Sequence, residues 1–98
     1  MSVFGLIGTR FNKVDFYNGS IFVNPATDTV LVDTGPLSQG LYEIGFLIYS
    51  DTSYVVDIEH RNASNTSNVH RVRIKGTSGV EYPLFWFPIS IMDGERVR

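Results

Sequence analysis

Residues 54–75 read YVVDIEHRNASNTSNVHRVRIK, two segments of alternating apolar and polar residues joined by a polar loop. Alternation with a period of two is typical of a half-buried antiparallel strand with one wet face. If the segments pair with like faces together, apolar residues and opposite charges both meet across the strands. The expected pairs are Val56–Ile74, Ile58–Val72, His60–His70, Asp57–Arg73 and Glu59–Arg71. We therefore predict a hairpin in which residues 54–60 pair with residues 69–75.

The rest of the chain carries the same strand signals, which are short runs of Val, Ile, Phe, Tyr and Thr between Gly, Asn, Asp, Pro and Ser. Strands are expected at roughly residues 3–11, 15–23, 29–34, 40–49, 54–60, 69–75, 80–91 and 95–98. Within the second segment, Asn18-Gly19 is typical of a tight hairpin turn. We expect an all-β fold, an antiparallel and jelly-roll-like β-sandwich of about seven or eight short strands.

Two of these segments are apolar on more than one face. Residues 40–49 have one fully apolar face and one that is only half polar. This pattern predicts a central strand that is covered on both sides, or a strand whose second face meets a partner. Residues 80–91 are apolar on both faces, but Pro83 and Pro88 cannot donate ladder hydrogen bonds, which predicts an edge strand or a strand interrupted at one of the prolines. An uncovered edge strand of this kind favours association.

Length and composition exclude several classes of function. The 98 residues fit one domain, residues 1–98. The net charge of −2 gives nucleic-acid binding no bulk electrostatic support. Because the chain has no Cys, disulfides, thiolate metal sites and a Cys nucleophile are excluded. No apolar run approaches the roughly 18 residues of a membrane span. We expect neither nucleic acid nor membrane as a partner.

The N-terminal segment MSVFGLIGTRF lacks the basic region of a signal peptide, and Gly5 and Gly8 interrupt its apolar run. We therefore expect no export signal here. Glycine is entropically costly to order, so a strand at this end needs something to hold it. We expect residues 1–11 to form an N-terminal arm that packs on a neighbouring subunit or on the surface to which the protein attaches. The apolar residues of this arm are Val3, Phe4, Leu6 and Ile7.

Candidate catalytic and metal-binding residues are few. His60 and His70 face each other in the expected hairpin, but a zinc site needs a further ligand, and Glu59 points to the opposite face. Asp57 and Glu59 lie beside arginines, which lowers the pKa of both carboxyl groups and suits neither for acid catalysis. The chain has no G-x-S-x-G elbow and no phosphate-binding glycine loop. We expect no enzymatic activity, no cofactor and no metal.

A basic stripe and several aromatic residues need an interpretation. Arg71, Arg73 and Lys75 lie on one face, as in some single-strand nucleic-acid sites, but the acids across the hairpin favour ion pairs instead. Aromatic side chains can also stack on sugars, although burial in the core or in a subunit contact is the interpretation that we favour. The residues concerned are Tyr17, Tyr49, Tyr54 and Trp86.

The loop of the hairpin contains two matches to the N-glycosylation pattern, at residues 62–64 and 65–67. Without an export signal, we expect these Asn, Ser and Thr side chains to shape the loop by bonding the local backbone.

Residues 40–74 and 87–98 resemble a pattern in small virion proteins of tailed bacteriophages. In that pattern, a G-x-Y-x-[IV] strand leads to a strand that ends in EHR, an N-A-x-N-x-x-N-V loop follows, and the last strand begins G-E-R-[VI]-R. The matching residues are Gly40, Tyr42, Ile44, Glu59, His60, Arg61, Asn62, Ala63, Asn65, Asn68, Val69, Gly94, Glu95, Arg96, Val97 and Arg98. Residues 1–39 show no part of the pattern.

The resemblance implies a jelly-roll-like structural protein of the virion, either a capsid decoration protein or a fibre or tail accessory. It implies a homo-oligomer, commonly a trimer, with the phage major capsid protein as the other partner. Adjacent strand residues face opposite ways, so Phe85, Trp86 and Phe87 cannot all be buried in one small sandwich. We expect one face of this segment to contact another subunit. The rival interpretation is a carbohydrate- or receptor-binding module.

Overall fold

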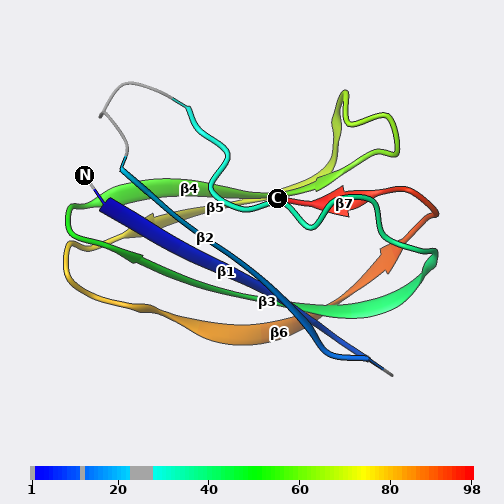
Figure 1. Ribbon diagram of the computed structural model, residues 1–98, viewed down its shortest axis with the longest axis horizontal. Coiled ribbons are helices and arrows are strands. Elements are labelled where there is room, and N and C mark those ends of the chain that lie inside the picture. The colour runs from blue at the N-terminus through cyan, green and yellow to red at the C-terminus, as the bar shows by residue number, and fades with distance from the viewer. Residues whose placement is uncertain (1, 12, 23–27) are drawn as a thin grey trace.

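The computed structural model describes residues 2–11, 13–22 and 28–98, with the side chains of residues 83–85 left out. This part of the chain contains seven strands. They are β1 (Ser2–Arg10), β2 (Asp15–Phe22), β3 (Gly40–Ser50), β4 (Tyr54–Arg61), β5 (Asn68–Gly76), β6 (Tyr82–Ile91) and β7 (Arg96–Val97). The strands form two antiparallel sheets that face each other (Figure 1).

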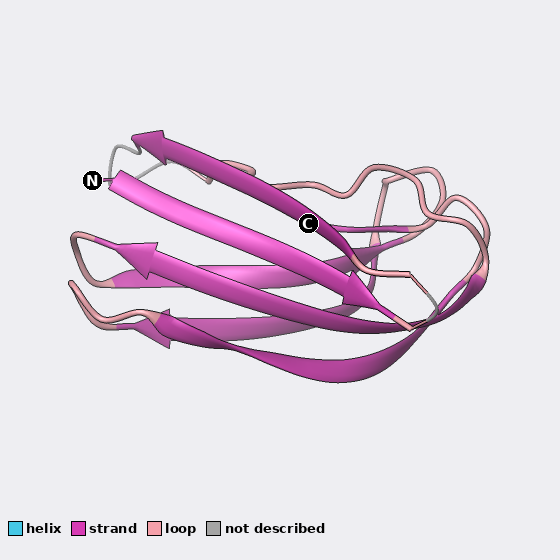
Figure 2. Cartoon of the chain, turned by 60° about the horizontal axis from the view of Figure 1, so that its bottom comes forward, coloured by secondary structure: helices cyan, strands magenta, loops and turns pink. Residues whose placement is uncertain are grey.

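Sheet A has four strands in the order β2-β1-β3-β6, and sheet B has three strands in the order β5-β4-β7. Figure 2 shows the strands of sheet A side by side in front of sheet B. The predicted all-β, antiparallel sandwich is therefore confirmed. A complete jelly roll has eight strands in two Greek keys. The described residues supply seven, in sheets of four and three.

The hairpin of β4 and β5 has the predicted register. Val56 pairs with Ile74, and Ile58 pairs with Val72. The pairs Asp57–Arg73, Glu59–Arg71 and His60–His70 follow in the same ladder. A bulge after His60 shifts the pairing by one residue before the loop. The apolar and charge patterns agreed on one register, and the backbone adopts it.

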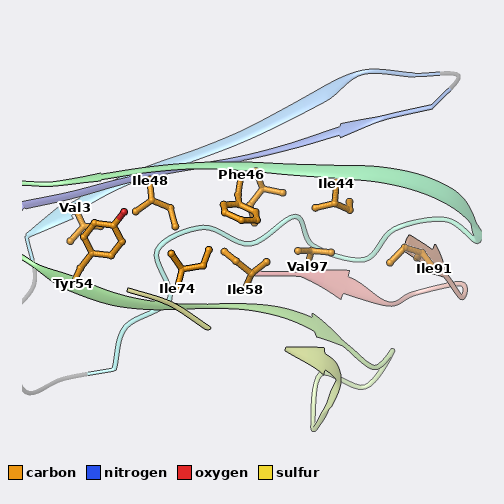
Figure 3. Packing of buried hydrophobic residues seen from close by; sticks show 10 residues of the cluster. Val3, Ile44, Phe46, Ile48, Tyr54, Ile58, Ile74, Ile91 and Val97 are labelled. Carbon is orange, nitrogen blue, oxygen red and sulfur yellow. The ribbon is translucent and has the colours of Figure 1, made fainter. Parts of the chain in front are cut away.

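The core lies between the inner faces of the two sheets. Figure 3 shows Ile44, Phe46 and Ile48 pointing from β3 toward Ile58 and Val97 of sheet B. These side chains alternate with outward-facing residues along β3, as the sequence pattern predicted. Strand β3 is central, between β1 and β6, as predicted for residues 40–49, but only its inner face is covered, since Leu41 and Tyr49 on the outer face are 53% and 43% exposed.

The expected N-terminal arm is wrong, because residues 2–10 form β1 in the middle of sheet A. Strand β1 pairs with β2 on one side and with β3 on the other. Its inward side chains Val3 and Ile7 are 5% and 1% exposed and belong to the core. Pairing along both edges offsets the entropic cost of ordering Gly5 and Gly8.

The hairpin expected at Asn18-Gly19 is also wrong. Strand β2 continues through both residues, which pair with Leu6 and Gly5 of β1. The connection between β1 and β2 lies at residues 11–14 instead, and Phe11 at its start has a φ of 116°. Asn18-Gly19 suits a turn but lies inside a strand. Glycine is required at position 19 by packing, not by a turn.

The packing requirement at Gly19 comes from residues 29–34. These residues were predicted to form a strand but have no regular secondary structure. This segment leads from sheet A to the end of β7, where the N–H of Thr34 donates to the carbonyl oxygen of Val97 at 3.0 Å. On the way, Leu31 lies directly against Gly5 and Gly19, and a Cβ atom on either glycine would overlap Leu31. The segment therefore closes the sandwich beside β1 and β2 without adding a strand.

Strand β6 is the edge of sheet A, as predicted from Pro83 and Pro88. A bulge next to Pro83 adds one residue to β6 between the pairs Phe46–Phe85 and Ile48–Tyr82. Because of this bulge, Tyr82 faces inward and stacks on Phe46 with ring centroids 5.5 Å apart. Without the bulge, alternation along β6 would put Tyr82 on the same face as Trp86.

Candidate functional site: two outer sheet faces

The outer face of sheet A carries a broad set of apolar side chains, which we call the apolar face. Phe16 and Phe22 are 54% and 76% exposed, although both belong to a regular strand. Strand alternation and register bring them onto one surface with residues of the other three strands. The apolar face consists of Phe4, Leu6, Phe16, Phe22, Leu41, Leu47, Tyr49 and Trp86. Exposed apolar patches of this kind mark interaction surfaces in soluble proteins.

Trp86 lies beside a row of two glycines on this face. The ladder places Gly8 beside Gly45, and Gly45 beside Trp86, so two strands present no side chain next to the indole. A Cβ atom on Gly8 would lie 2.7 Å from the Cη2 atom of Trp86 and 3.0 Å from Phe16. The Trp86 and Phe16 rings meet edge to face across this row, with centroids 6.4 Å apart. The two glycines thus let aromatic rings from strands that are not neighbours touch each other.

Arg10 covers the indole of Trp86. Its guanidinium carbon lies 4.3 Å from the ring centroid, a cation–π geometry. The same guanidinium reaches the Glu43 carboxylate, with Nη2 3.2 Å from Oε2. The ion pair fixes the arginine over the ring, and the ring carries a polar cap on an otherwise apolar surface.

The predicted interface residues divide between the two faces of sheet A. Phe4, Leu6 and Trp86 lie on the apolar face, where they can contact a partner. Val3 and Ile7, also predicted to lie in an interface, are instead buried in the core of the chain.

Phe87, another predicted interface residue, faces inward. It is partly buried and lies edge to face with Phe46, at a centroid distance of 6.2 Å. The prediction for Phe85 concerns a side chain outside the described residues. Among the candidate sugar-stacking residues, Tyr17 and Tyr54 also point into the core, while Tyr49 and Trp86 face outward.

Sequence reasoning missed the β2 contribution to this face, which is Phe16 and Phe22. The signal was present, since Phe16, Asn18, Ser20 and Phe22 alternate with Tyr17 and Ile21. A turn at Asn18-Gly19 would interrupt this alternation, so the two halves were not recognised as one strand.

The outer face of sheet B is basic. Six of the eight Lys and Arg residues lie on it, against the acids Asp57 and Glu59 and, at its margin, Asp33. We call it the basic face, and its cations are Arg61, Arg71, Arg73, Lys75, Arg96 and Arg98. The remainder of the chain therefore carries a large excess of acids, which the net charge of −2 conceals.

Ion pairs neutralise part of this positive charge. Arg73 binds Asp57 through two hydrogen bonds of 2.9 and 3.2 Å, and they are the main reason that the pKa of Asp57 is lowered. Glu59 bonds Arg98 at 2.8 Å and Asn68 at 2.9 Å rather than the facing Arg71.

Burial acts to raise the pKa of Glu59, but the hydrogen bonds from Asn68 and Arg98 outweigh it, and the pKa is lowered. The predicted lowering of both carboxyl pKa values is confirmed. Arg71 is left 4.0 Å from Asp57, and Lys75 has no ion pair among the described residues.

The histidine pair has a partner that the sequence did not reveal. The buried His60 places Nε2 2.9 Å from Oε1 of Glu95, which also accepts a 2.7 Å hydrogen bond from the backbone N–H of Met92. His70 is exposed, and its ring centroid lies 5.6 Å from that of His60. The described residues contain no cluster of three or more His, Cys, Asp or Glu that could hold a metal ion.

The loop between β4 and β5 is organised by Asn62, as expected of a loop-forming residue. Its side-chain oxygen accepts hydrogen bonds from the backbone N–H groups of Thr66 and Ser67, at 2.8 and 3.2 Å. Its amide nitrogen donates to the hydroxyls of the same two residues. Arg61 clamps the loop from the strand side through Asn65, with bonds to its side chain and its carbonyl oxygen.

A cleft of about 1230 Å³ lies between the sheets, beside residues 28–32. Its walls are core residues of β1, β3 and β4, and the buried hydroxyl of Tyr54 has no hydrogen-bond partner in the described part of the chain. Residues 28–32 follow directly in the sequence on residues 23–27, which lie outside the described residues. The two outer faces are therefore the better defined candidate sites.

No protein-family model, curated protein or solved structure matches the chain. The part of the chain that the structure describes has no helix of the length and apolar character that crossing a membrane requires. Function is therefore inferred from the two faces and from the sequence pattern described above.

Proposed function

We propose that this protein is a non-enzymatic structural protein of a bacteriophage virion that assembles with copies of itself through the apolar face. The observation that carries the proposal is the exposure of Phe16 and Phe22 beside Trp86, on a regular sheet face of a small protein. Apolar side chains at this density are costly to leave in water. A permanent partner removes that cost.

The size of the face fits a second copy of the chain. Four strands of eight to eleven residues, at about 3.3 Å per residue and about 4.8 Å between strands, span roughly 30 by 19 Å. Two such faces bury on the order of 1,200 Å² in total, the lower end of the range for specific interfaces. A contact of this size stabilises an oligomer in which each copy retains its own core.

Carbohydrate binding is the rival function, and the geometry of Trp86 argues against it. A sugar stacks on the open face of an aromatic ring. Here the guanidinium of Arg10 occupies that position over the Trp86 ring and is held there by Glu43. Protein–protein contacts accommodate an arginine–tryptophan stack readily, since both residue types are enriched in interfaces.

The assignment to capsid decoration rests on the resemblance of residues 40–74 and 87–98 to small virion proteins. In that role the protein binds the major capsid protein at the surface of the shell. The resemblance implies a trimer there, whereas packing the apolar faces of two copies against each other gives a dimer. A fibre or tail accessory uses the same apolar face for self-association and differs in its place on the virion.

Sedimentation velocity and native mass spectrometry of the purified chain at micromolar concentration test self-association. We expect an oligomer, and we expect Phe16→Glu to dissociate it while the far-ultraviolet circular dichroism is retained. Val55→Glu, on the exposed outer face of sheet B, is the matched control and should leave the oligomer intact. A monomeric wild-type protein would contradict the proposed assembly. Immunogold labelling of purified phage particles tests the virion location.

A further inference from the structure

Strand β5 leaves one edge of sheet B open. Within the described residues it pairs with β4 only, over the nine residues Asn68–Gly76. Its single irregularity lies at the loop end, after His60–His70, and the strand contains no proline. Apart from β4, no described residue forms a backbone hydrogen bond with residues 69–75. An edge of this length is a template for a further strand.

The side chains along this edge favour one kind of strand. On the outer face, the charges of Arg71 and Lys75 are not neutralised by a close ion pair. The nearest carboxylate oxygen to Arg71 is 4.0 Å away, and Lys75 has no described ion pair. On the inner face, Val72 is 47% exposed although its cross-strand partner Ile58 is buried. An incoming strand that alternates acidic and apolar residues would neutralise the first group and cover the second.

Strand β4 is an example of such a partner. Its sequence Val56-Asp57-Ile58-Glu59 alternates apolar and acidic residues and pairs with β5 in register. Cations at every second position of β5 are about 6.6 Å apart, the same interval as acids at every second position of a partner strand. The free edge of β5 therefore offers a second strand the same kinds of backbone groups, cations and apolar side chains that already bind β4.

We propose that the free edge of β5 binds an extended segment of a partner protein in which acidic and β-branched apolar residues alternate. The segment adds a fourth strand to sheet B by backbone hydrogen bonding, with its carboxylates beside Arg71 and Lys75 and an apolar side chain against Val72. This site lies on the opposite sheet from the apolar face and does not depend on self-association.

A peptide titration tests the proposal. The probe is a capped nine-residue peptide in which glutamate alternates with valine, labelled with a fluorophore and measured by anisotropy at low and at moderate salt. We expect saturable binding that weakens as salt rises. The same peptide N-methylated at every residue keeps its charges but has no N–H donor on either edge, so it cannot pair along β5 and should not bind.

Lys75→Glu is the decisive variant, because this exposed side chain has no described partner whose loss would affect folding. Losing one cross-strand charge pair and placing like charges together should weaken binding about fivefold, a change of about 1 kcal/mol. Lys13→Glu, the same change in the β1–β2 connection, should leave the affinity unchanged. In the complex, β5 amide protons that point away from β4 should exchange more slowly.

Three results would overturn the proposal. Equal binding of the N-methylated peptide would show a charge attraction without strand addition. An unchanged affinity of the Lys75→Glu variant would place the peptide elsewhere. Binding of an eight-nucleotide oligothymidylate in preference to the peptide would identify the basic face as a nucleic-acid site.

Discussion

His60 and Glu95 form the buried contact that ties β4 to the turn before β7. The carboxylate of Glu95 accepts hydrogen bonds from the Met92 backbone N–H and from His60. The Met92 bond is the larger cause, and the His60 bond the second, of a Glu95 pKa below its ordinary value of 4.5. Because the folded protein favours the ionised form, this contact stabilises the fold fully above that pH. The stabilisation is lost as the pH falls through the lowered, folded-state pKa.

Glu95→Gln should therefore reduce the free energy of unfolding at neutral pH by about 1 kcal/mol, since a charge-assisted hydrogen bond becomes a neutral one. The difference from the wild-type protein should shrink below about pH 4, where the wild-type carboxyl group also becomes neutral. Urea unfolding at several pH values measures this. Glu81→Gln, at an exposed acid before β6, should show no such difference. A constant difference from pH 3 to pH 8 would refute the linkage.

Gly5 is required because the side chain of Leu31 occupies the place of its Cβ atom. Gly5→Ala should cost about 1–3 kcal/mol through overpacking. In the double variant with Leu31→Ala, part of that cost should be recovered, a coupling of about 0.5 kcal/mol or more. Gly40→Ala is the control, because the nearest atom to its added Cβ, in Tyr42, lies 3.7 Å away. Strictly additive effects in thermal or urea unfolding would show that residues 29–34 do not pack on β1.

At the scale of single elements, the hairpin of β4 and β5 was predictable because two independent patterns chose the same register. The prediction failed for Asn18-Gly19 and for residues 29–34 because tertiary packing decided both. Leu31 needs glycines beneath it, and local sequence does not show that these segments meet. Of the apolar face, only Phe4, Leu6 and Trp86 were predicted as interface residues. The contribution of β2 was missed because the contact of Leu31 with Gly19, which keeps β2 continuous, joins segments that are distant in the sequence.

The ion pair of Arg73 with Asp57 gives the hairpin a measurable charge preference. Arg73→Glu replaces two hydrogen bonds with a like-charge pair and should lower the free energy of unfolding by roughly 0.2–1 kcal/mol. The effect should be smaller at 1 M salt, because the pair is solvent-exposed. Lys75→Glu is the control on the same face, since Lys75 faces Val55 rather than an acid. Equal losses in the two variants would mean that general charge balance, not this pair, is responsible.

Strand β1 is one of the two interior strands of sheet A, and this position predicts the effect of truncation. Deleting residues 1–8 removes the pairing partner of both β2 and β3, together with the buried side chains of Val3 and Ile7. We expect the loss of the cooperative thermal transition and of the near-ultraviolet circular dichroism. Phe4→Ser, on the outer face of the same strand, should leave a cooperative transition. A truncated protein that melts cooperatively would restore the interpretation of these residues as an arm.

At the scale of the whole molecule, the sandwich separates two kinds of surface by the thickness of its core. The apolar face belongs to sheet A, and the basic face with the open β5 edge belongs to sheet B. Strand alternation produces this separation, because each sheet directs one set of side chains inward and the other outward. A protein built in this way can join copies of itself through one sheet and still present the other sheet to a different partner.

The two surfaces should therefore be independent in a variant test. Phe16→Glu should weaken self-association at least about tenfold, as expected when a charge replaces a large exposed aromatic side chain in an interface. The Phe16→Glu substitution should leave the affinity for the glutamate–valine peptide within about twofold. Lys75→Glu should do the reverse, and a protein with both substitutions should show both losses without a further one, since distant sites act additively. Analytical ultracentrifugation and peptide anisotropy on the same four proteins measure this. Loss of peptide binding in the Phe16→Glu protein would mean that the β5 edge is competent only within the oligomer, with the two sheets coupled rather than separate.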